Sequence, residues 1–264
     1  MIALNIIRYL SWRAASRHTR QSGHIFHKQA EIHYITYGTG EPVVLLHGGL
    51  SNKLSWFSQI PMLVRSGWQV ILIDTRGHVN STLGKEPLSY QLFAEDVLNV
   101  LKHLCIQKAD FIGWSDGGIT ALILGQHSPS HVNRIIAISA NISPTGLTMQ
   151  SQRQFRQKTR PFISWIKKCW TGAKDYLNEL EDQIWHIWSS PIMSEIDLSH
   201  IVTPTLIIVG ELDIVTQEHS EKMVSVLKNG KLKIINHGGH ATPVTHANEI
   251  NALINSFLVH QPIQ

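Results

Sequence analysis

The sequence predicts an α/β protein with a mostly parallel central sheet, helices on both faces of that sheet, and a small helical cap. Short apolar runs alternate with segments of helical apolar spacing over residues 43–140, and the alternation resumes at residue 205. This alternation is typical of βαβ units, which bring parallel strands side by side. The stretch 143–202 interrupts the alternation and holds four of the eight tryptophans, which indicates an insertion.

The expected strands are short apolar runs, and the first two of them form an entry hairpin. In chain order the strands cover 24–29, 31–37, 43–46, 70–73, 111–112, 135–140, 205–209 and 232–235. The expected helices cover 55–66, 89–104, 119–124 and 248–258. Ser89 is expected to cap the second helix, because a serine hydroxyl accepts a hydrogen bond from a free N–H at a helix start.

A chain of 264 residues with 43% hydrophobic residues can bury one sizeable core. We expect an α/β core at 23–142 and 203–264, a helical cap at 143–202, and a basic, amphipathic segment at 1–22. Four arginines recur in that segment at near-helical spacing: Arg8, Arg13, Arg17 and Arg20. The segment is expected to be a peripheral helix on the domain or a frayed end, with contact between residues 1–20 and a membrane surface as the alternative.

The stretch Gly113-Trp114-Ser115-Asp116-Gly117 joins an apolar strand to a helix-like segment. A Gly-x-Ser-x-Gly sequence at such a joint is typical of a nucleophile elbow, a turn so tight that the serine adopts a strained backbone conformation. Small residues two positions away on each side keep the neighbouring backbone apart. We therefore predict that Ser115 is an exposed catalytic nucleophile.

A nucleophilic serine needs a base within hydrogen-bond reach and an acid that orients the base. After a nucleophile elbow, the acid and then the histidine follow in the chain. Asp213 and His240 each lie in a loop directly after an apolar strand, in this order. Ser115, Asp213 and His240 are therefore the predicted catalytic residues. Glu211 is the competing acid and His237 is the competing histidine.

The residues His47-Gly48-Gly49 follow the apolar strand 43–46. In acyl transfer, the tetrahedral intermediate carries an oxyanion that needs two preorganised N–H donors. We predict the backbone N–H of Asp116 as one donor and that of Gly49 or Leu50 as the other. His47 is predicted to be a structural hydrogen-bonding residue rather than a base.

These motifs resemble those of the α/β-hydrolase superfamily, and they occur in the order of that family over most of the chain. They are His47-Gly48-Gly49, Asp74-Thr75-Arg76-Gly77-His78, Gly113-Trp114-Ser115-Asp116-Gly117-Gly118, Gly210-Glu211-Leu212-Asp213 and Gly238-Gly239-His240. The run 113–120, GWSDGGIT, is especially similar to the valacyclovir-hydrolase-like (biphenyl-hydrolase-like) branch. The resemblance implies an α/β-hydrolase fold and a serine hydrolase that acts on small esters.

One loop departs from the family pattern. After Asp-x-Arg-Gly-His the family usually places Gly-x-Ser, whereas this chain has Val79-Asn80-Ser81. A β-branched residue adopts a positive φ only at a cost. We therefore expect this loop to be rebuilt relative to the family.

Tryptophans are predicted to line the substrate pocket as an apolar roof that excludes water. They are Trp114 beside the nucleophile and, in the cap, Trp165, Trp170, Trp185 and Trp188. For part of this group the alternative is that the indole rings pack the cap helices against the core.

Asp116 has two interpretations. Its carboxylate could pair with a cationic group on the substrate, such as an α-amine. Alternatively, it is an acid at the start of a helix, where the helix dipole stabilises negative charge.

Composition argues against several other classes. The net charge is +4 and the sequence pI is near 9.1, but the basic residues are dispersed, so nucleic-acid binding is not expected. Cys105 and Cys169 lack a metal or redox spacing and are expected to be free thiols. No metal or phosphate-loop motif is present, so no metal and no cofactor are expected.

No run of 18 apolar residues predicts a transmembrane helix. A cytoplasmic location is expected, with peripheral membrane attachment or export as alternatives.

The predicted function is a cofactor-free serine hydrolase that cleaves small carboxylic esters through an acyl-enzyme intermediate. The same three residues could act on a lactone, thioester, amide or C–C bond, or transfer an acyl group to another acceptor. A non-catalytic ligand-binding protein of the same fold is the third hypothesis.

Overall fold

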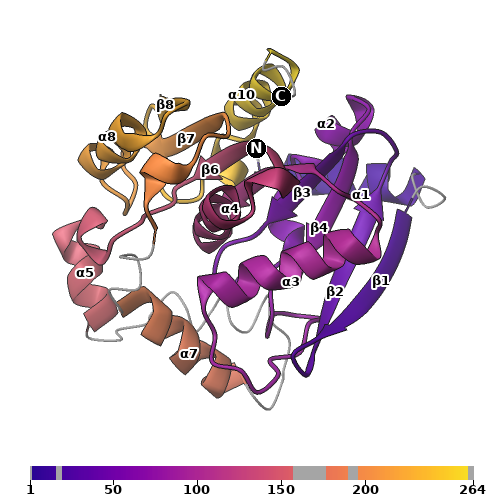
Figure 1. The fold of residues 1–264 in the computed structure, drawn as a ribbon. Helices are drawn as coiled ribbons and strands as arrows, with labels where there is room; N and C mark the ends of the chain where they lie inside the picture. Colours follow the sequence, from indigo (N-terminus) through magenta and orange to yellow (C-terminus); the bar gives the residue numbers. More distant parts are fainter. Residues whose placement is uncertain (1, 16–19, 157–176, 190–195, 261–264) are drawn as a thin grey trace.

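The computed structural model describes residues 2–15, 20–156, 177–189 and 196–260. An eight-stranded sheet crosses the molecule in the order β1-β2-β4-β3-β5-β6-β7-β8 (Figure 1). The pairs β1–β2 and β2–β4 are antiparallel, and the remaining pairs, from β4–β3 to β7–β8, are parallel. The prediction of a mostly parallel sheet is therefore confirmed.

The strands are β1 (Arg20–His27), β2 (Ala30–Tyr37), β3 (Pro42–Leu46), β4 (Gln69–Ile73), β5 (Ala109–Trp114), β6 (Val132–Ile138), β7 (Thr205–Gly210) and β8 (Gly230–Ile235). The α-helices are α1 (Ile2–Ala15), α2 (Ile60–Arg65), α3 (Tyr90–His103), α4 (Asp116–His127), α5 (Met149–Arg156), α7 (Leu177–Ser189), α8 (Gln217–Val226), α9 (Thr242–Thr245) and α10 (Ala247–His260). The short 3₁₀ helices are η2 (Lys53–Trp56), η3 (Pro129–His131), η4 (Pro144–Gly146) and η6 (Leu198–His200).

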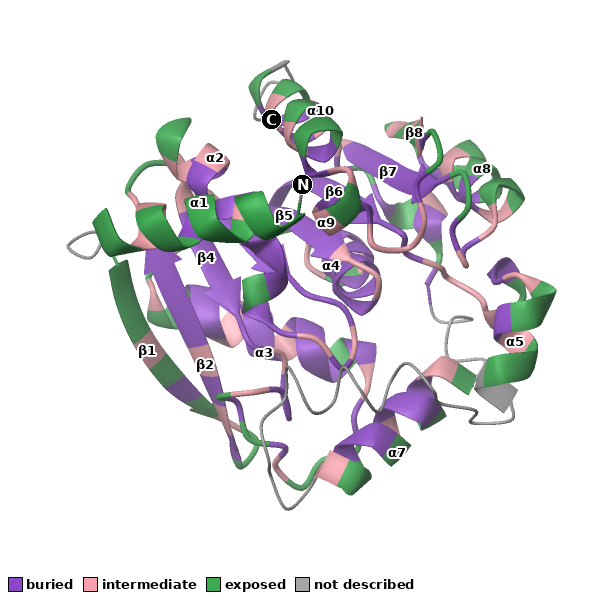
Figure 2. Cartoon of the chain, turned by 180° about the vertical axis from the view of Figure 1, so that it is seen from behind, coloured by how far each residue is buried: buried purple, intermediate pink, exposed green. Residues whose placement is uncertain are grey.

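Helices cover both faces of the sheet, and each face has its own apolar core (Figure 2). Successive side chains of a strand point to opposite faces. In β3, for example, Val44 and Leu46 join the core formed with α3, α4 and α8, whereas Val43 and Leu45 join the core formed with α1, α2 and α10. Burial on both faces explains why the parallel strands are continuous apolar runs in the sequence.

Several predicted elements have different ends in the structure. β1 begins at Arg20 and ends at His27, so the prediction of a strand to residue 29 was wrong: Lys28 and Gln29 form the hairpin turn, with φ of 44° and 59°. The predicted helix 55–66 is divided into η2 and α2. Pro61 lies in the first turn of α2, where its missing N–H costs no helix hydrogen bond.

The N-cap predicted for α3 is confirmed. The hydroxyl oxygen of Ser89 accepts a hydrogen bond from the Leu92 N–H at 3.1 Å. This cap fixes the start of α3, whose first residue, Tyr90, is buried and contributes to the site described below.

The stretch predicted as a cap contains the helices α5 and α7, which lie together at one end of the molecule (Figure 1). α7 buries Leu180, Ile184 and Ile187 in the same core as α3 and α4. Trp165, Trp170 and Cys169 lie outside the described residues. Among the helices that are described, none is both long and apolar enough to span a bilayer.

Candidate active site

Ser115 lies at the turn between β5 and α4 and has φ of 54° and ψ of −119°. Its N–H donates a hydrogen bond to the carbonyl oxygen of Ile138 at 2.8 Å, which holds the turn against β6. A Cβ atom on Gly113 would lie 2.1 Å from the carbonyl oxygen of Gly117, and one on Gly117 would lie 2.1 Å from that of Leu46. The elbow therefore needs glycine at both positions, and the serine has the strained conformation predicted for it.

The structure brings Ser115, His240 and Asp213 into one hydrogen-bonded chain. His240 Nε2 lies 3.1 Å from Ser115 Oγ, and His240 Nδ1 lies 2.7 Å from Asp213 Oδ1. The side chain of His240 is 28% exposed, whereas that of Asp213 is fully buried. The three residues come from loops after β5, β8 and β7. They meet because parallel strands end at one edge of the sheet.

The carboxylate of Asp213 accepts further hydrogen bonds. Ser139 donates its hydroxyl to Asp213 Oδ2 at 2.5 Å, and Val215 donates its N–H to Asp213 Oδ1 at 3.1 Å. Burial alone would raise the pKa of Asp213, but the hydrogen bond and charge of His240, together with these donors, hold that pKa below its ordinary value. Asp213 is therefore ionised beside the imidazole.

Ser139 was missed in the sequence. It is the first residue after β6, with φ of 53°, and its N–H donates to the carbonyl oxygen of Ile208 at 2.7 Å. A sequence signal for Ser139 does exist. It is a hydroxyl residue at the end of β6, the strand between β5, which leads to Ser115, and β7, which leads to Asp213.

The competing acid and histidine lie together away from this chain of hydrogen bonds. Glu211 Oε2 accepts the backbone N–H of His237 at 2.7 Å and lies 3.5 Å from the ring atom Nδ1 of the same residue. Both side chains are exposed, His237 by 88% and Glu211 by 48%. These contacts favour Asp213 over Glu211 and His240 over His237.

Of the two alternative donors in the loop after β3, one is already used. The N–H of Leu50 donates to His78 Nε2 at 3.0 Å, so Leu50 cannot also bind an oxyanion in this conformation, and the prediction of Leu50 as a donor was wrong. Gly49 and Asp116 offer backbone N–H groups that make no hydrogen bond within the described part of the chain.

His47 holds the same loop. Its Nε2 accepts the N–H of Thr75 at 3.0 Å, so Nδ1 carries the proton and donates to the carbonyl oxygen of Gly48 at 2.8 Å. Burial lowers the pKa of His47 to about 3, which keeps the ring neutral at physiological pH. These contacts agree with the structural role predicted for His47.

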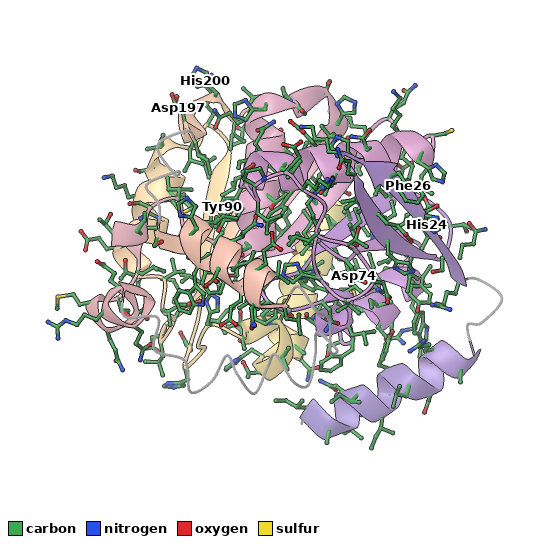
Figure 3. All side chains as sticks on the ribbon, turned by 90° about the horizontal axis from the view of Figure 1, so that it is seen from below. His24, Phe26, Asp74, Tyr90, Asp197 and His200 are labelled. Atoms are coloured by element: carbon green, nitrogen blue, oxygen red, sulfur yellow. The ribbon has the colours of Figure 1, made fainter. Side chains whose placement is uncertain are left out.

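The carboxylate of Asp116 is buried and bonded on both sides. The side chain is 6% exposed; Tyr90 donates its hydroxyl to Oδ1 at 2.9 Å, and Trp188 donates its indole N–H to Oδ1 and Oδ2 at 2.9 and 3.0 Å. Burial raises the pKa of Asp116 to about 6, although the Trp188 and Tyr90 hydrogen bonds oppose the rise. Tyr90, near the middle of the molecule in Figure 3, was also missed, because only the fold brings α3 to the elbow.

The predicted pocket tryptophans have different positions. Trp114 donates its indole N–H to the carbonyl oxygen of His240 at 2.8 Å and thus holds the loop of the candidate base. Trp188 is bonded to Asp116, the residue directly after Ser115. Trp185 is 1% exposed and packs against Trp188 with ring centres 5.3 Å apart, which matches the packing alternative.

Val79 adopts a positive φ of 44°, the conformation expected to be costly for a β-branched residue at this position. The loop is held on both sides of it: the Ser81 N–H donates to the carbonyl oxygen of His78 at 2.8 Å, and the Ser81 hydroxyl donates to that of Asp74 at 2.6 Å. These bonds outweigh the local backbone strain.

In the ranges that the structure describes, no three His, Cys, Asp or Glu side chains gather as a metal site would require. Cys105 is a free and exposed thiol.

Comparison with known proteins agrees with the fold. A family model described as "alpha/beta hydrolase fold" matches residues 41–163. The putative non-heme chloroperoxidase of Synechocystis sp. is 28% identical over 86% of this chain and 95% of that protein. Serine hydrolase BPHL of Mus musculus is 28% identical over 86% of this chain and 82% of that protein. The solved structure titled "Est816 as an N-Acyl homoserine lactone degrading enzyme" is 25% identical, with a TM-score of 0.77 over 89% of this chain and all of that one.

The sheet order, the elbow and these matches together define the fold: the chain has the α/β-hydrolase fold. Among proteins of this fold it is similar to the biphenyl-hydrolase-like serine hydrolases, as the run 113–120 predicts.

Proposed function

We propose that this protein is a serine hydrolase that cleaves small carboxylic esters through an acyl-enzyme intermediate. The observation that carries the proposal is the chain of hydrogen bonds from Ser115 Oγ to His240, at 3.1 Å, and from His240 to Asp213, at 2.7 Å. A serine beside a base that is itself oriented by a carboxylate has the arrangement that nucleophilic catalysis requires.

In the proposed reaction, Ser115 Oγ attacks the ester carbonyl carbon while His240 Nε2 accepts the hydroxyl proton. The tetrahedral intermediate collapses, and His240 gives that proton to the leaving alcohol. Water then attacks the acyl-enzyme with His240 as base, which releases the carboxylic acid and restores the serine. Asp213 accepts a hydrogen bond from the Nδ1–H of His240 throughout and stabilises the imidazolium.

The N–H groups of Gly49 and Asp116 are the proposed donors to the oxyanion. Gly49 lies in the loop after β3. Asp116 is the first residue of α4, where the helix dipole adds positive potential. Loss of one such donor typically costs about 10²- to 10³-fold in rate.

The stretch 143–202 is the proposed cap over this site. The bond between Trp188 of α7 and Asp116 supports this role, because it ties the inserted stretch to the residue after the nucleophile. Asp116 is proposed to be structural rather than a partner for a substrate amine, since Tyr90 and Trp188 already bind its carboxylate.

The same residues would open a lactone, which is a cyclic ester, and the similarity to Est816 makes lactones the second substrate class to test. Thioesters, amides, C–C bonds and acyl transfer use the same machinery and remain further alternatives. The intact chain of hydrogen bonds argues against a non-catalytic binding protein. The sparse cysteines support a cytoplasmic location.

The test is a panel of esters and lactones that varies acyl size and includes an amino-acid ester with its uncharged isostere. We expect hydrolysis of at least the small esters, and we expect its loss in Ser115→Ala. Equal kcat/KM for the charged and uncharged pair agrees with a structural Asp116. A preference for the amine that disappears in Asp116→Asn would assign that carboxylate to substrate binding.

A further inference from the structure

Helix α1 has one face that is attached to the domain. Tyr9 is 4% exposed and stacks on Trp12 with ring centres 6.1 Å apart, and Trp12 in turn lies 5.3 Å from the ring of Tyr37 in β2. Tyr9 belongs to the core that α2 and α10 share. This aromatic face fixes α1 on the outside of the sheet.

Much of the remaining surface of α1 is exposed and aliphatic, and is called the aliphatic face here. Five large apolar side chains on this one helix are 40–60% exposed: Ile2, Leu4, Ile6, Ile7 and Leu10. They are five of the twelve exposed large hydrophobic side chains of the described residues. Most of α1 is coloured as exposed in Figure 2. Contiguous exposed apolar patches are characteristic of interaction surfaces on proteins.

The charged residues on and near α1 are basic, which favours an anionic partner. The helix contains Arg8 and Arg13 and no acidic residue. Between α1 and the sheet lies a cavity of about 500 Å³ whose lining includes Arg13, Arg20 and Lys53, and no described acidic side chain lines it. Lys53 forms an ion pair with the buried Asp74, so the two arginines supply the excess positive charge.

Arg13 connects the cavity to the aliphatic face. It follows Ile6 by seven residues and Tyr9 by four, and helical spacing therefore places it between the aliphatic and the aromatic faces of α1. A ligand that combines an anionic group with hydrocarbon matches this arrangement. A second copy of the chain matches it less well, because pairing two α1 faces would bring like-charged arginines together.

We propose that α1 is an interfacial anchor that binds an anionic phospholipid surface. The aliphatic face enters the boundary between headgroups and acyl chains, and the arginine-lined cavity takes a lipid phosphate. Apolar area and attraction to anionic lipid both contribute to such binding, and neither requires a membrane-spanning helix.

The test is co-sedimentation of the full-length protein with vesicles of phosphatidylcholine, with and without phosphatidylglycerol. We expect binding to the anionic vesicles that weakens with salt. Ile7→Asp should reduce the binding constant about tenfold or more, and Arg13→Gln with Arg20→Gln should reduce it about fivefold for each charge. Phe26→Asp is the matched control, because Phe26 is 75% exposed on β1 and far from α1 in Figure 3. It should bind as wild type does.

Three outcomes would overturn the proposal. One is the absence of vesicle binding, and another is binding that none of the α1 variants weakens. The third is a wild-type dimer in light scattering that Ile7→Asp converts to a monomer, which would assign the face to a second copy. Glycerol phosphate in solution serves as competitor: if it binds and vesicles do not, the cavity is a soluble-phosphate site. Binding is measured without ester, so a failure here leaves the proposed hydrolase activity unaffected.

Discussion

Trp188 in α7 donates its indole N–H to both carboxylate oxygens of Asp116, at 2.9 and 3.0 Å. Asp116 directly follows Ser115, and its own backbone N–H is a proposed oxyanion donor. Helix α7 is thus hydrogen-bonded to the first residue of α4, directly after Ser115. Position and electrostatics of the site therefore depend on α7.

Replacing Trp188 by Phe should disturb the site while keeping an aromatic ring. We expect kcat/KM for a small ester to fall about three- to tenfold, because one hydrogen bond to a buried charged group is lost. Trp68→Phe is the control. Trp68 packs near Arg134, at 5.6 Å from the guanidinium carbon, so its change should leave kcat/KM unaltered. Equal effects of both changes would contradict a role for the Trp188–Asp116 bond.

Asp116 should make folding stability depend on pH. Burial raises its pKa to about 6 in the folded state, whereas an unfolded aspartate has a pKa of about 3.9. The folded state therefore binds more protons between these values, and stability contributed by the neutral carboxyl is lost as pH rises through about 6.

The variant Asp116→Asn tests this dependence, because the amide is uncharged and keeps an acceptor oxygen. From about pH 4 to about pH 8, its free energy of unfolding should rise relative to wild type by on the order of 2 kcal/mol. Urea unfolding at both pH values measures the change. A difference between the two proteins that is the same at both pH values would be incompatible with the raised pKa.

Replacing Asp213 and Glu211 one at a time by their amides should distinguish the roles of the two carboxylates. Asp213→Asn should lower kcat by about 10⁴, because an amide no longer holds the catalytic tautomer of His240. Glu211→Gln is the matched control, since Glu211 is two residues earlier but contacts His237 at the surface. It should leave kcat unchanged. The reverse ranking of the two variants would reassign the acid.

The buried ion pair of Arg76 and Asp96 should contribute to the free energy of unfolding. Arg76 is fully buried and donates from Nε to Asp96 Oδ2 at 2.9 Å and from Nη2 to Oδ1 at 2.6 Å. Arg76→Met leaves the Asp96 charge buried without this partner and should cost about 3–5 kcal/mol of unfolding free energy. Glu95→Gln, which removes the exposed pair with Lys28, should leave the urea midpoint nearly unchanged. Similar losses in both variants would refute the dependence on burial.

The sequence predicts well those features that depend on neighbouring residues. The elbow at Ser115 could be found because two glycines and one strand–helix joint suffice to define it. Asp213 and His240 could be placed because parallel strands end at one edge of the sheet, so that the loops after them converge.

The features that were missed depend on contacts between distant segments. Nothing near Tyr90 or Ser139 in the sequence indicates that they bind Asp116 and Asp213. The use of the Leu50 N–H depends on the position of the His78 ring, 28 residues later. Val79 adopted a strained φ because hydrogen bonds around it outweigh its local preference.

The most direct measurement is the intact mass of the folded protein after treatment with a fluorophosphonate, an inhibitor that phosphonylates activated serines. We predict one covalent adduct, located at Ser115 by peptide mapping, with labelling abolished in Ser115→Ala and strongly slowed in His240→Gln but not in His237→Gln. Folded wild-type protein that acquires no adduct, or acquires it at another serine, would contradict the assignment of Ser115 as a nucleophile.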